Sequence, residues 1–466
     1  MHRFKRIFSF ADRFKMLLSS IDMTQGKPWK KLLIFTIPLL IGNVFQQFYS
    51  IADAIILGRF VGDYALAAVG SSMPIFFLIM VLMMGIAIGA GIMAAQYFGA
   101  KRREDLSYTI GNCITITAVL GLLLMALAPL LTRPLLTFLG TPAEILEDSI
   151  MYMTILLYGV LGLAYFNVLS GILRGLGDAF SPLLYLAFTS LLNVVLNFVF
   201  IAGFGLGMPA VAAGTVLAQG ISSVLCFRRL RKMRDTFDMG RHYLRPRKKY
   251  TVQVLKLGIP TGVSQAIVAL GVMVVQPLVN GFGPLVVTTW VVVMRIDGLV
   301  MMPNFSFGNA VTVFTGQNMG AGKKERIPKG LRQCLIMAAG TALVLVGGIL
   351  LFGRHIAGAF TETQEVIELS QRMLRILAPG YVVFAVAMVF WGTVRGAGDA
   401  ISPLWSSLIN TIVVRIPTAY LLVHFWGTPE ALMYSMLITW TVNMLLSITV
   451  YRIGKWRKSG IVKPAG

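Results

Sequence analysis

The stretch Ile172-Leu-Arg-Gly-Leu-Gly-Asp-Ala-Phe-Ser-Pro182 decides the fold, because the chain contains it twice. It returns 221 positions later as Thr393-Val-Arg-Gly-Ala-Gly-Asp-Ala-Ile-Ser-Pro403. The same interval carries Gln96-Tyr-Phe-Gly-Ala100 onto Gln317-Asn-Met-Gly-Ala321. Since this interval is close to half of the 466 residues, the two halves are predicted to be duplicated copies of one unit.

Composition places the chain in a membrane. Hydrophobic residues make up 56% and charged residues 13%, and the mean hydropathy is +0.77, which is more apolar than a water-soluble core requires. Apolar runs of about 20 residues recur, the length that a bilayer core needs. Lipid offers no partners for backbone polar groups, and the runs are too long for barrel strands, so they are predicted to be α-helices. The predicted spans are 32–57, 65–98, 108–131, 150–172, 182–203, 211–227, 252–280, 285–318, 334–353, 375–394, 403–423 and 431–451.

The sequence therefore predicts an all-α integral membrane protein with twelve transmembrane helices in two duplicated six-helix bundles. Six spans per copy is an even number, so both copies begin on the same side of the membrane, and such parallel repeats rock around a central cavity. This organisation favours a secondary transporter. The expected parts are an amphipathic basic N-terminal segment (1–27), an N-lobe (28–227), a basic linker (228–251), a C-lobe (252–452) and a basic tail (453–466).

The net charge of +22 follows membrane topology rather than nucleic-acid binding. Most of the Lys and Arg residues lie in the tails and in the even-numbered loops, whereas the odd-numbered loops hold few. By the positive-inside rule, both termini are expected in the cytoplasm, with the chain crossing the inner (plasma) membrane many times. The linker is read as a cytoplasmic loop, and a role with anionic lipid headgroups stays open.

Other classes of site are not visible in the sequence. Cys113, Cys226 and Cys334 lie in or beside spans without paired spacing, so they indicate neither disulfides nor a metal site. There is no phosphate-binding Gly-x4-Gly-Lys-Ser/Thr motif and no set of nucleophile and base. We expect a protein that is not an enzyme and uses no cofactor, and that works as a monomer in the lipid bilayer on small drug-like molecules.

The repeated phrase itself predicts a turn. Its glycines, followed by proline, suit a tight cytoplasmic connection between two helices. The arginines and aspartates are expected to cap or pair locally, in a turn that does not contact substrate. The residues assigned to the two turns are Arg174, Gly175, Gly177, Asp178, Arg395, Gly396, Gly398 and Asp399.

Polar side chains line one face of three spans in the first half, because they recur every three or four residues. The stripes are Asn43, Gln46, Ser50 and Asp53 on the first span, Ser190, Asn193 and Asn197 on the fifth, and Thr215, Gln219 and Ser222 on the sixth. A carboxylate with amide and hydroxyl oxygens suits a hard cation such as Na⁺, or a carboxylate that loads a proton. Two other interpretations stay open: the stripes are interhelical contacts, and Asp53 is solvated near the outer end of its span.

The second half places three ionisable residues inside spans, where each is costly and needs a reason. Arg295 and Asp297 are two positions apart, so they do not share a helix face. One hypothesis has them and Arg415 lining the substrate cavity, which favours anionic or zwitterionic substrates. The alternative is a buried ion pair between helices, such as Asp297 with Arg415. The residues assigned to the cavity are Gln46, Ser50, Gln219, Arg295, Asp297 and Arg415.

The chain resembles the multidrug and toxic compound extrusion (MATE) family over residues 28–452. The resemblance rests on Ile51-Ala-Asp-Ala-Ile-Ile-Leu-Gly-Arg59, Asn193-Val-Val-Leu-Asn197, the Gln-x-x-Gly-Ala turns and the doubled Arg-Gly-x-Gly-Asp phrase. It implies export of bulky, amphipathic and usually cationic compounds, driven by Na⁺ or H⁺ through alternating access.

The resemblance also implies a cation site, matched here by Asp53, Asn193, Asn197 and Thr215. Some members carry a second carboxylate where this chain has Asn197, so a two-acid site is ruled out. Other members carry acids in spans seven and ten, but 252–280 and 375–394 hold neither Asp nor Glu. The counterpart of Asp53 is about Val275. Coupling is therefore expected in the N-lobe alone.

Two other transporter classes compete with this interpretation. A flippase for lipid-linked saccharides, from the same broader superfamily, would share the rocking bundles, and arginines in the cavity would attract its pyrophosphate. Twelve spans and the doubled phrase fit the drug exporters better. A major facilitator transporter also has six plus six helices, but its Gly-x3-Asp-Arg/Lys-x-Gly-Arg loop is missing at 98–105.

Overall fold

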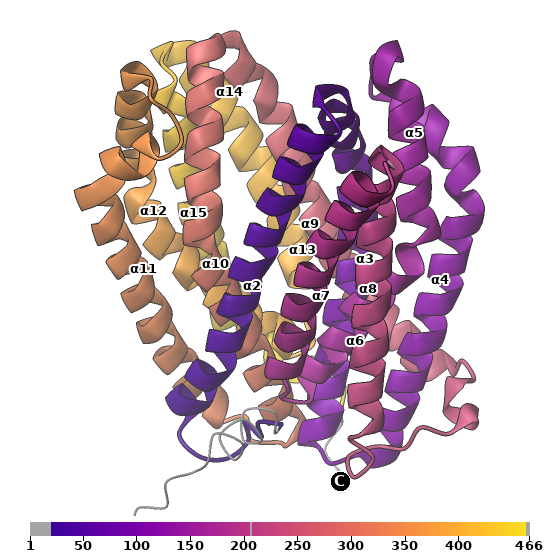
Figure 1. Ribbon diagram of the computed structural model, residues 1–466. Helices are drawn as coiled ribbons and strands as arrows, with labels where there is room; N and C mark the ends of the chain where they lie inside the picture. The colour runs from indigo at the N-terminus through magenta and orange to yellow at the C-terminus, as the bar shows by residue number, and fades with distance from the viewer. Residues whose placement is uncertain (1–19, 206, 463–466) are drawn as a thin grey trace, which may run out of the picture.

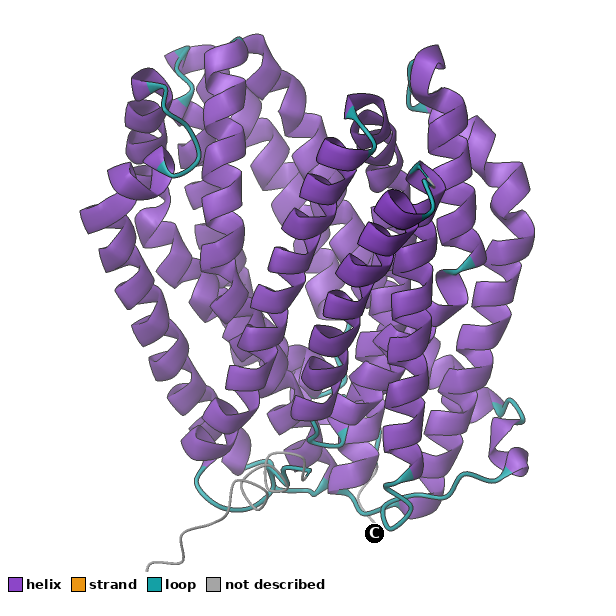
Figure 2. Cartoon of the chain, in the orientation of Figure 1, coloured by secondary structure: helices purple, strands orange, loops and turns teal. Residues whose placement is uncertain are grey.

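The computed structural model describes residues 20–205 and 207–462, without the side chains of residues 48–50, 52–54, 63, 66 and 202. The described chain folds into helices joined by short loops and contains no strand (Figure 2). The basic segment predicted at 1–27 is described only from residue 20 onward, so its amphipathic part lies outside the described residues.

Each half of the described chain contains seven α-helices and one π-helix, and the second half also ends in a short 3₁₀-helix. The first half contains α2 (Pro28–Phe60), α3 (Asp63–Gly99), α4 (Arg103–Phe138), α5 (Ala143–Tyr158), α6 (Val160–Gly175), α7 (Phe180–Phe198), the π-helix η1 (Val199–Gly203) and α8 (Met208–Arg231). The short 3₁₀-helix η2 (Arg241–Leu244) lies in the linker. The second half contains α9 (Lys248–Gly281), α10 (Pro284–Gly320), α11 (Arg326–Gly358), α12 (Gln364–Gly396), α13 (Ile401–Leu408), the π-helix η3 (Ile409–Arg415), α14 (Ile416–Trp426), α15 (Glu430–Ile453) and the 3₁₀-helix η4 (Lys455–Lys458).

The predicted twelve spans are confirmed, with one irregularity that the hydropathy did not indicate. Eleven described helices are long and apolar enough to cross a membrane, and α5 with α6 makes the twelfth. These two helices are bent by 48° at Gly159. A Cβ on Gly159 would lie 2.1 Å from the side chain of Val216, so the bend places α6 against α8 at a contact that only glycine allows.

The two halves form two bundles that stand side by side (Figure 1). The N-lobe comprises α2 to α8 and the C-lobe α9 to α15, and they meet where α2 and α3 pack against α9 and α10. The bundles lie close together at the end where the described chain begins, at residue 20, and ends, at residue 462, and they diverge toward the other end. We call these the tail end and the far end.

The repeated glutamines join the lobes at the tail end. Gln96 donates a hydrogen bond to the carbonyl of Gly396 (3.0 Å), and Gln317 donates one to the carbonyl of Gly175 (3.0 Å). Their carbonyl oxygens accept from the two tails, Gln317 from the backbone N–H of Met23 (2.8 Å) and Gln96 from that of residue 461 (2.7 Å). Both glutamines are fully buried. The duplication thus produces two reciprocal hydrogen bonds across the lobe boundary and two more that attach the tails.

Two repeated glycines make this approach possible. A Cβ on Gly99 would lie 2.0 Å from the carbonyl oxygen of Gln317, and one on Gly320 would lie 1.8 Å from that of Gln96. No side chain fits at such distances. The two Gln-x-x-Gly-Ala turns therefore serve as the contact surface between the lobes.

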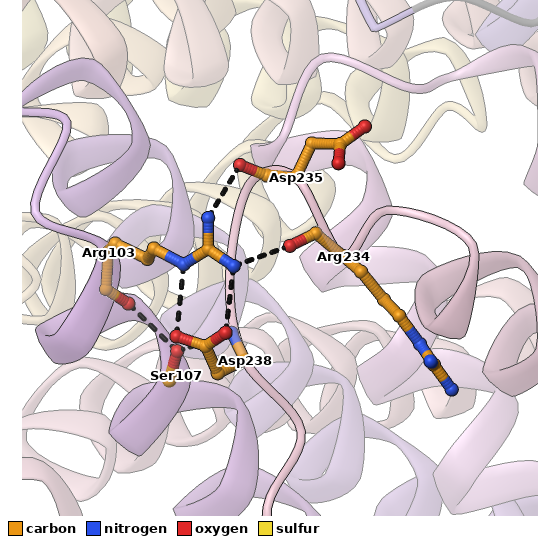
Figure 3. A network of polar contacts seen from close by, with 5 residues as sticks. All are labelled: Arg103, Ser107, Arg234, Asp235 and Asp238. Carbon is orange, nitrogen blue, oxygen red and sulfur yellow. Dashed lines mark hydrogen bonds and ion pairs between the residues drawn. The ribbon is translucent and has the colours of Figure 1, made fainter.

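Hydrogen bonds attach the basic linker to the N-lobe. The guanidinium of Arg103, at the start of α4, donates to the carboxylate of Asp238 (2.7 and 2.9 Å) and to the carbonyls of Arg234 (2.7 Å) and Asp235 (3.1 Å). The hydroxyl of Ser107 accepts from the backbone N–H of Asp238 (2.8 Å), as Figure 3 shows. The hydrogen bond from Arg103 holds the pKa of the Asp238 carboxyl below its usual value.

Candidate functional site

The asparagines predicted on the fifth span form a buried polar group in the N-lobe. Asn193 and Asn197, one turn apart on α7, are both fully buried. The Asn197 amide donates to the Asn193 carbonyl oxygen (3.0 Å), and the Asn193 amide donates to the hydroxyl of Thr215 on α8 (3.4 Å). Further along the same two helices, the hydroxyls of Thr189 and Ser222 are 2.5 Å apart. The polar stripes of the fifth and sixth spans, on α7 and α8, therefore face each other.

Gly214 makes room for this group. A Cβ at position 214 would lie 2.0 Å from the side-chain oxygen of Asn197 and 3.6 Å from the amide nitrogen of Asn193. Gly214 was not among the residues predicted for the site, and its only signal in the sequence is its place next to Thr215. The amide of Asn197 thus has a position fixed by its own hydrogen bond and by the backbone of α8.

The backbone of Asp53 lies at the level of these asparagines. Helix α2 runs beside α7, with a Cβ on Gly42 reaching 3.5 Å from Leu183 near one end and the rings of Phe60 and Phe198 5.8 Å apart at the other. These contacts are 18 residues apart on α2 and 15 apart on α7, so position 53 lies within about one helical turn of the level of position 193. The side chains of Ser50 and Asp53 lie outside the described residues.

The other N-lobe candidates are spread along the helices. Gln46 is exposed on α2. One turn nearer the tail end, the amide of Asn43 donates to the hydroxyl of Ser306 across the lobe boundary (3.1 Å). Gln219 on α8 is half-buried, and its side-chain oxygen has no hydrogen-bond partner among the described residues. Gln46 therefore belongs to the lobe boundary, whereas Gln219 lies within the N-lobe apart from the asparagine group.

The predicted turns are present, and both aspartates cap the following helix. Asp178 accepts from the backbone N–H (2.9 Å) and hydroxyl (2.7 Å) of Ser181, and Asp399 does the same with Ser402 (3.0 and 2.6 Å). Gly177 and Gly398 have φ angles of 87° and 103°, which favour glycine. The tails cross the two turns, because a Cβ on either glycine would meet a carbonyl of residue 21 (2.3 Å) or 459 (2.5 Å).

The pairing of arginine with aspartate within each turn is not formed. The buried carboxylate of Asp178 instead receives the guanidinium of Arg229 on α8 (2.8 Å). Arg174 and Arg395 are half-buried, and the Nε atom of Arg395 has no hydrogen-bond partner among the described residues. Of the two expected roles, capping is therefore present in both turns, through the aspartates, and no ion pair joins arginine to aspartate within either turn.

Asp297 points into the C-lobe. It shares a face of α10 with Asn304, seven residues on, and the amide of Asn304 donates to the backbone carbonyl of Tyr381 on α12 (3.4 Å). Charge on Asp297 interacts with Arg415, at the end of η3, but no nitrogen–oxygen distance between them is within 4.0 Å. The direct ion pair offered as an alternative is therefore not formed. Asp297 instead lies beside the hydroxyl of Tyr381 on α12, and the side-chain oxygen of Asn304 is buried without a hydrogen-bond partner in the described chain.

Arg295 lies on the other side of α10. Its side chain is exposed, and no hydrogen bond or ion pair joins it to a described residue. Arg295, Asp297 and Arg415 thus do not converge: one lies on the exposed face of α10, and the other two lie inside the C-lobe.

Comparison with known proteins identifies the unit that is duplicated. The MatE family model matches the chain twice, at residues 38–199 and again at 260–421. The chain is 30% identical to the probable multidrug resistance protein YoeA of Bacillus subtilis (strain 168), over 95% of this chain and 98% of that protein. It is 25% identical to the probable multidrug resistance protein NorM of Thermotoga maritima, over 93% and 94%.

Solved structures share the whole fold. An outward-facing multidrug resistance MATE family transporter of the MOP superfamily matches with a TM-score of 0.87 and 26% identity, over 94% of this chain and 99% of that one. A MOP superfamily transporter from Pyrococcus furiosus, whose binding pocket is described as having reversed polarity, matches with a TM-score of 0.84 and 26% identity, over 96% and 100%.

Proposed function

The chain belongs to the MatE family of multidrug efflux transporters, and on this premise we propose that it is a cation-coupled antiporter. It exports amphipathic, mostly cationic drugs or toxic compounds by alternating access, in exchange for Na⁺ or H⁺. The observation that carries the proposal is the asparagine group of the N-lobe, which lies level with Asp53 on the neighbouring helix.

The coupling ion is assigned to Asp53, Asn193, Asn197 and Thr215. A carboxylate, amide oxygens and a hydroxyl are the oxygen ligands that a hard cation prefers. The same carboxylate can carry a proton instead, with the amides as its hydrogen-bond partners. Because Asn193 and Asn197 are ordered by each other and by Gly214, a change in the charge of Asp53 is transmitted to α7 and α8 together.

The direction of transport follows from placing the tails in the cytoplasm. The many basic residues of the tails and the linker support this placement in the inner (plasma) membrane. The lobes then meet on the cytoplasmic side, through Gln96 and Gln317, and diverge toward the outside. In the opposite state these contacts would open and the far end would close.

The energetics permit either ion. One positive charge moving inward gains about 2.3 kcal/mol per 100 mV, and a tenfold concentration gradient costs about 1.4 kcal/mol. One uncompensated charge therefore sustains roughly a fiftyfold gradient of a neutral compound at 100 mV. For exchange of one monovalent ion against a monovalent cationic drug, the membrane potential cancels and only the ion gradient drives export.

We propose that the protein is a transporter rather than an enzyme, and that it acts as a monomer without a cofactor. The multidrug relatives do not favour the lipid-linked saccharide flippase, and neither does the separation of Arg295 from Arg415. Export is tested by reconstituting the purified chain in liposomes and imposing a Na⁺ or H⁺ gradient on a fluorescent organic cation. Gradient-driven movement supports the proposal, and movement of a labelled lipid with no dye transport refutes it.

A further inference from the structure

Three residues of α10 stand on one line of the helix. Arg295, Ser306 and Gln317 are spaced by 11 residues, which is three helical turns and about 16 Å. Gln317 donates to the N-lobe carbonyl of Gly175 (3.0 Å), and Ser306 accepts from the N-lobe amide of Asn43 (3.1 Å). The line therefore marks the face of α10 that points at the N-lobe.

Arg295 is the far-end member of this line. Three turns beyond Ser306, the lobes have diverged (Figure 1), and the Arg295 side chain is exposed. A guanidinium turned toward lipid at this depth is costly, whereas one turned toward the other lobe faces the path that alternating access opens to water. No described residue neutralises its charge.

The duplication shows that the charge is not needed to build the helix. The N-lobe counterparts of Gln317 and Ser306 are Gln96 and Gly85, which also face the opposite lobe. The counterpart of Arg295 is Pro74, which is exposed and uncharged. The cation is thus present on the C-lobe side alone.

The surroundings on the same boundary are apolar or neutral. On α9, Gly262 packs against α3, since its Cβ would lie 3.1 Å from Leu82. Met273 stands 11 residues further along the same line and is 49% exposed. Across the boundary, α2 offers the exposed amide of Gln46. A flexible thioether accepts varied apolar groups, so the described boundary pairs one fixed cation with adaptable apolar surface.

We propose that Arg295 binds an acidic group of the substrate, so that the preferred compounds are zwitterions: amphipathic amines that also carry a carboxylate or sulfonate. A guanidinium fits a carboxylate with two parallel hydrogen bonds, and the apolar body of the substrate lies against surfaces such as Met273. This inference rests on the proposed function as an exporter, and it moves the preferred substrates from cations to zwitterions.

A matched pair of dyes tests the inference. Rhodamine B is a zwitterion, and its ethyl ester is a cation with the same fluorophore. Binding of each is measured by fluorescence anisotropy in phosphatidylcholine nanodiscs, for the wild type, Arg295→Gln, Arg295→Lys and Arg133→Gln. Arg133 is an exposed arginine of α4 paired with Glu147, so its variant controls for loss of one surface charge.

The expected result is binding of rhodamine B that is weaker by about tenfold or more in Arg295→Gln, with the ester unchanged. Arg295→Lys should retain most of the preference, and Arg133→Gln all of it. Equal effects on both dyes, no effect on either, or no binding of the zwitterion by the wild type would overturn the inference. So would loss of the preference in phosphatidylglycerol nanodiscs, because the net-anionic headgroup of that lipid would then be the occupant of Arg295.

Binding needs no ion gradient, so the test is independent of export. Preference for the zwitterion through Arg295 in a protein that transports neither dye would support this inference and refute the proposed function. Gradient-driven export of both dyes that is indifferent to Arg295 would do the reverse.

Discussion

A single methyl group at Gly320 should open the tail end of the transporter. The Cβ of Gly320→Ala would lie 1.8 Å from the carbonyl oxygen of Gln96, whereas carbon and carbonyl oxygen ordinarily stay about 3.3 Å apart. Relief requires about 1.5 Å of movement. The obstacle is backbone on the opposite lobe, so no rotamer change removes it.

That movement also breaks hydrogen bonds. The four side-chain hydrogen bonds of Gln96 and Gln317 are 2.7 to 3.0 Å long, and each contributes about 1 kcal/mol net. Overpacking alone costs about 1–3 kcal/mol. Loss of one of these bonds together with overpacking penalises this state by about 2–4 kcal/mol. With no penalty on the state in which the tail ends separate, the equilibrium shifts about 30- to 700-fold. Gly99→Ala should act in the same direction, because its Cβ would lie 2.0 Å from Gln317.

The shift can be measured by electron–electron double resonance with spin labels at positions 104 and 325. Glu104 and Glu325 are repeat counterparts, exposed near the tail end, one on each lobe. The three buried native cysteines are replaced by alanine in every variant. We expect one short distance in the parent and a dominant longer distance in Gly320→Ala. The control is Gly298→Ala, on the same helix, whose Cβ meets nothing within 4 Å. Distances in Gly320→Ala that match this control would refute the reasoning.

Two further changes probe the N-lobe. Gly214→Ala places a Cβ 2.0 Å from the Asn197 side-chain oxygen and should reduce gradient-driven dye export in liposomes about tenfold or more. The control, Gly220→Ala, has nothing within 4 Å of its Cβ and should export normally. Equal export rates in the two variants would contradict the ordering role of Gly214. Arg103→Gln should raise hydrogen exchange at the backbone N–H of Asp238, which Ser107 now holds. Since the pKa of the Asp238 carboxyl is lowered in the folded protein, the wild-type linker should stay protected at neutral pH and loosen only as the pH falls through that lowered pKa; loosening near pH 7 would argue against the Arg103 contact.

The duplication and the hydropathy predicted the twelve helices and the two bundles, because bilayer thickness and backbone hydrogen bonding leave few alternatives for such a sequence. They did not predict the bend at Gly159 or the π-helices η1 and η3. The bend depends on how Gly159 fits against Val216, a contact between helices far apart in the chain. Hydropathy describes each span alone and contains no information on contacts between helices.

The site was predictable in part. Helical spacing predicted that polar side chains line one face of α7 and one face of α8. The hydrogen bonds among Asn193, Asn197 and Thr215 show that these two faces meet. Spacing also separated Arg295 from Asp297. It could not show that Asp178 pairs with Arg229, because that contact joins α8 to a turn 51 residues earlier. Nor could it show that each repeated glutamine binds the Arg-Gly-x-Gly-Asp turn of the opposite half. A repeat shows that two segments are equivalent, but not which segments are close in space.

The central claim is that Asp53 couples ion entry to export. The most direct test reconstitutes the wild type and Asp53→Asn in liposomes and follows a fluorescent organic cation under an imposed Na⁺ or H⁺ gradient. One of the two gradients should drive export by the wild type, and Asp53→Asn should lose this export while still binding the dye. Full gradient-driven export by Asp53→Asn would contradict it.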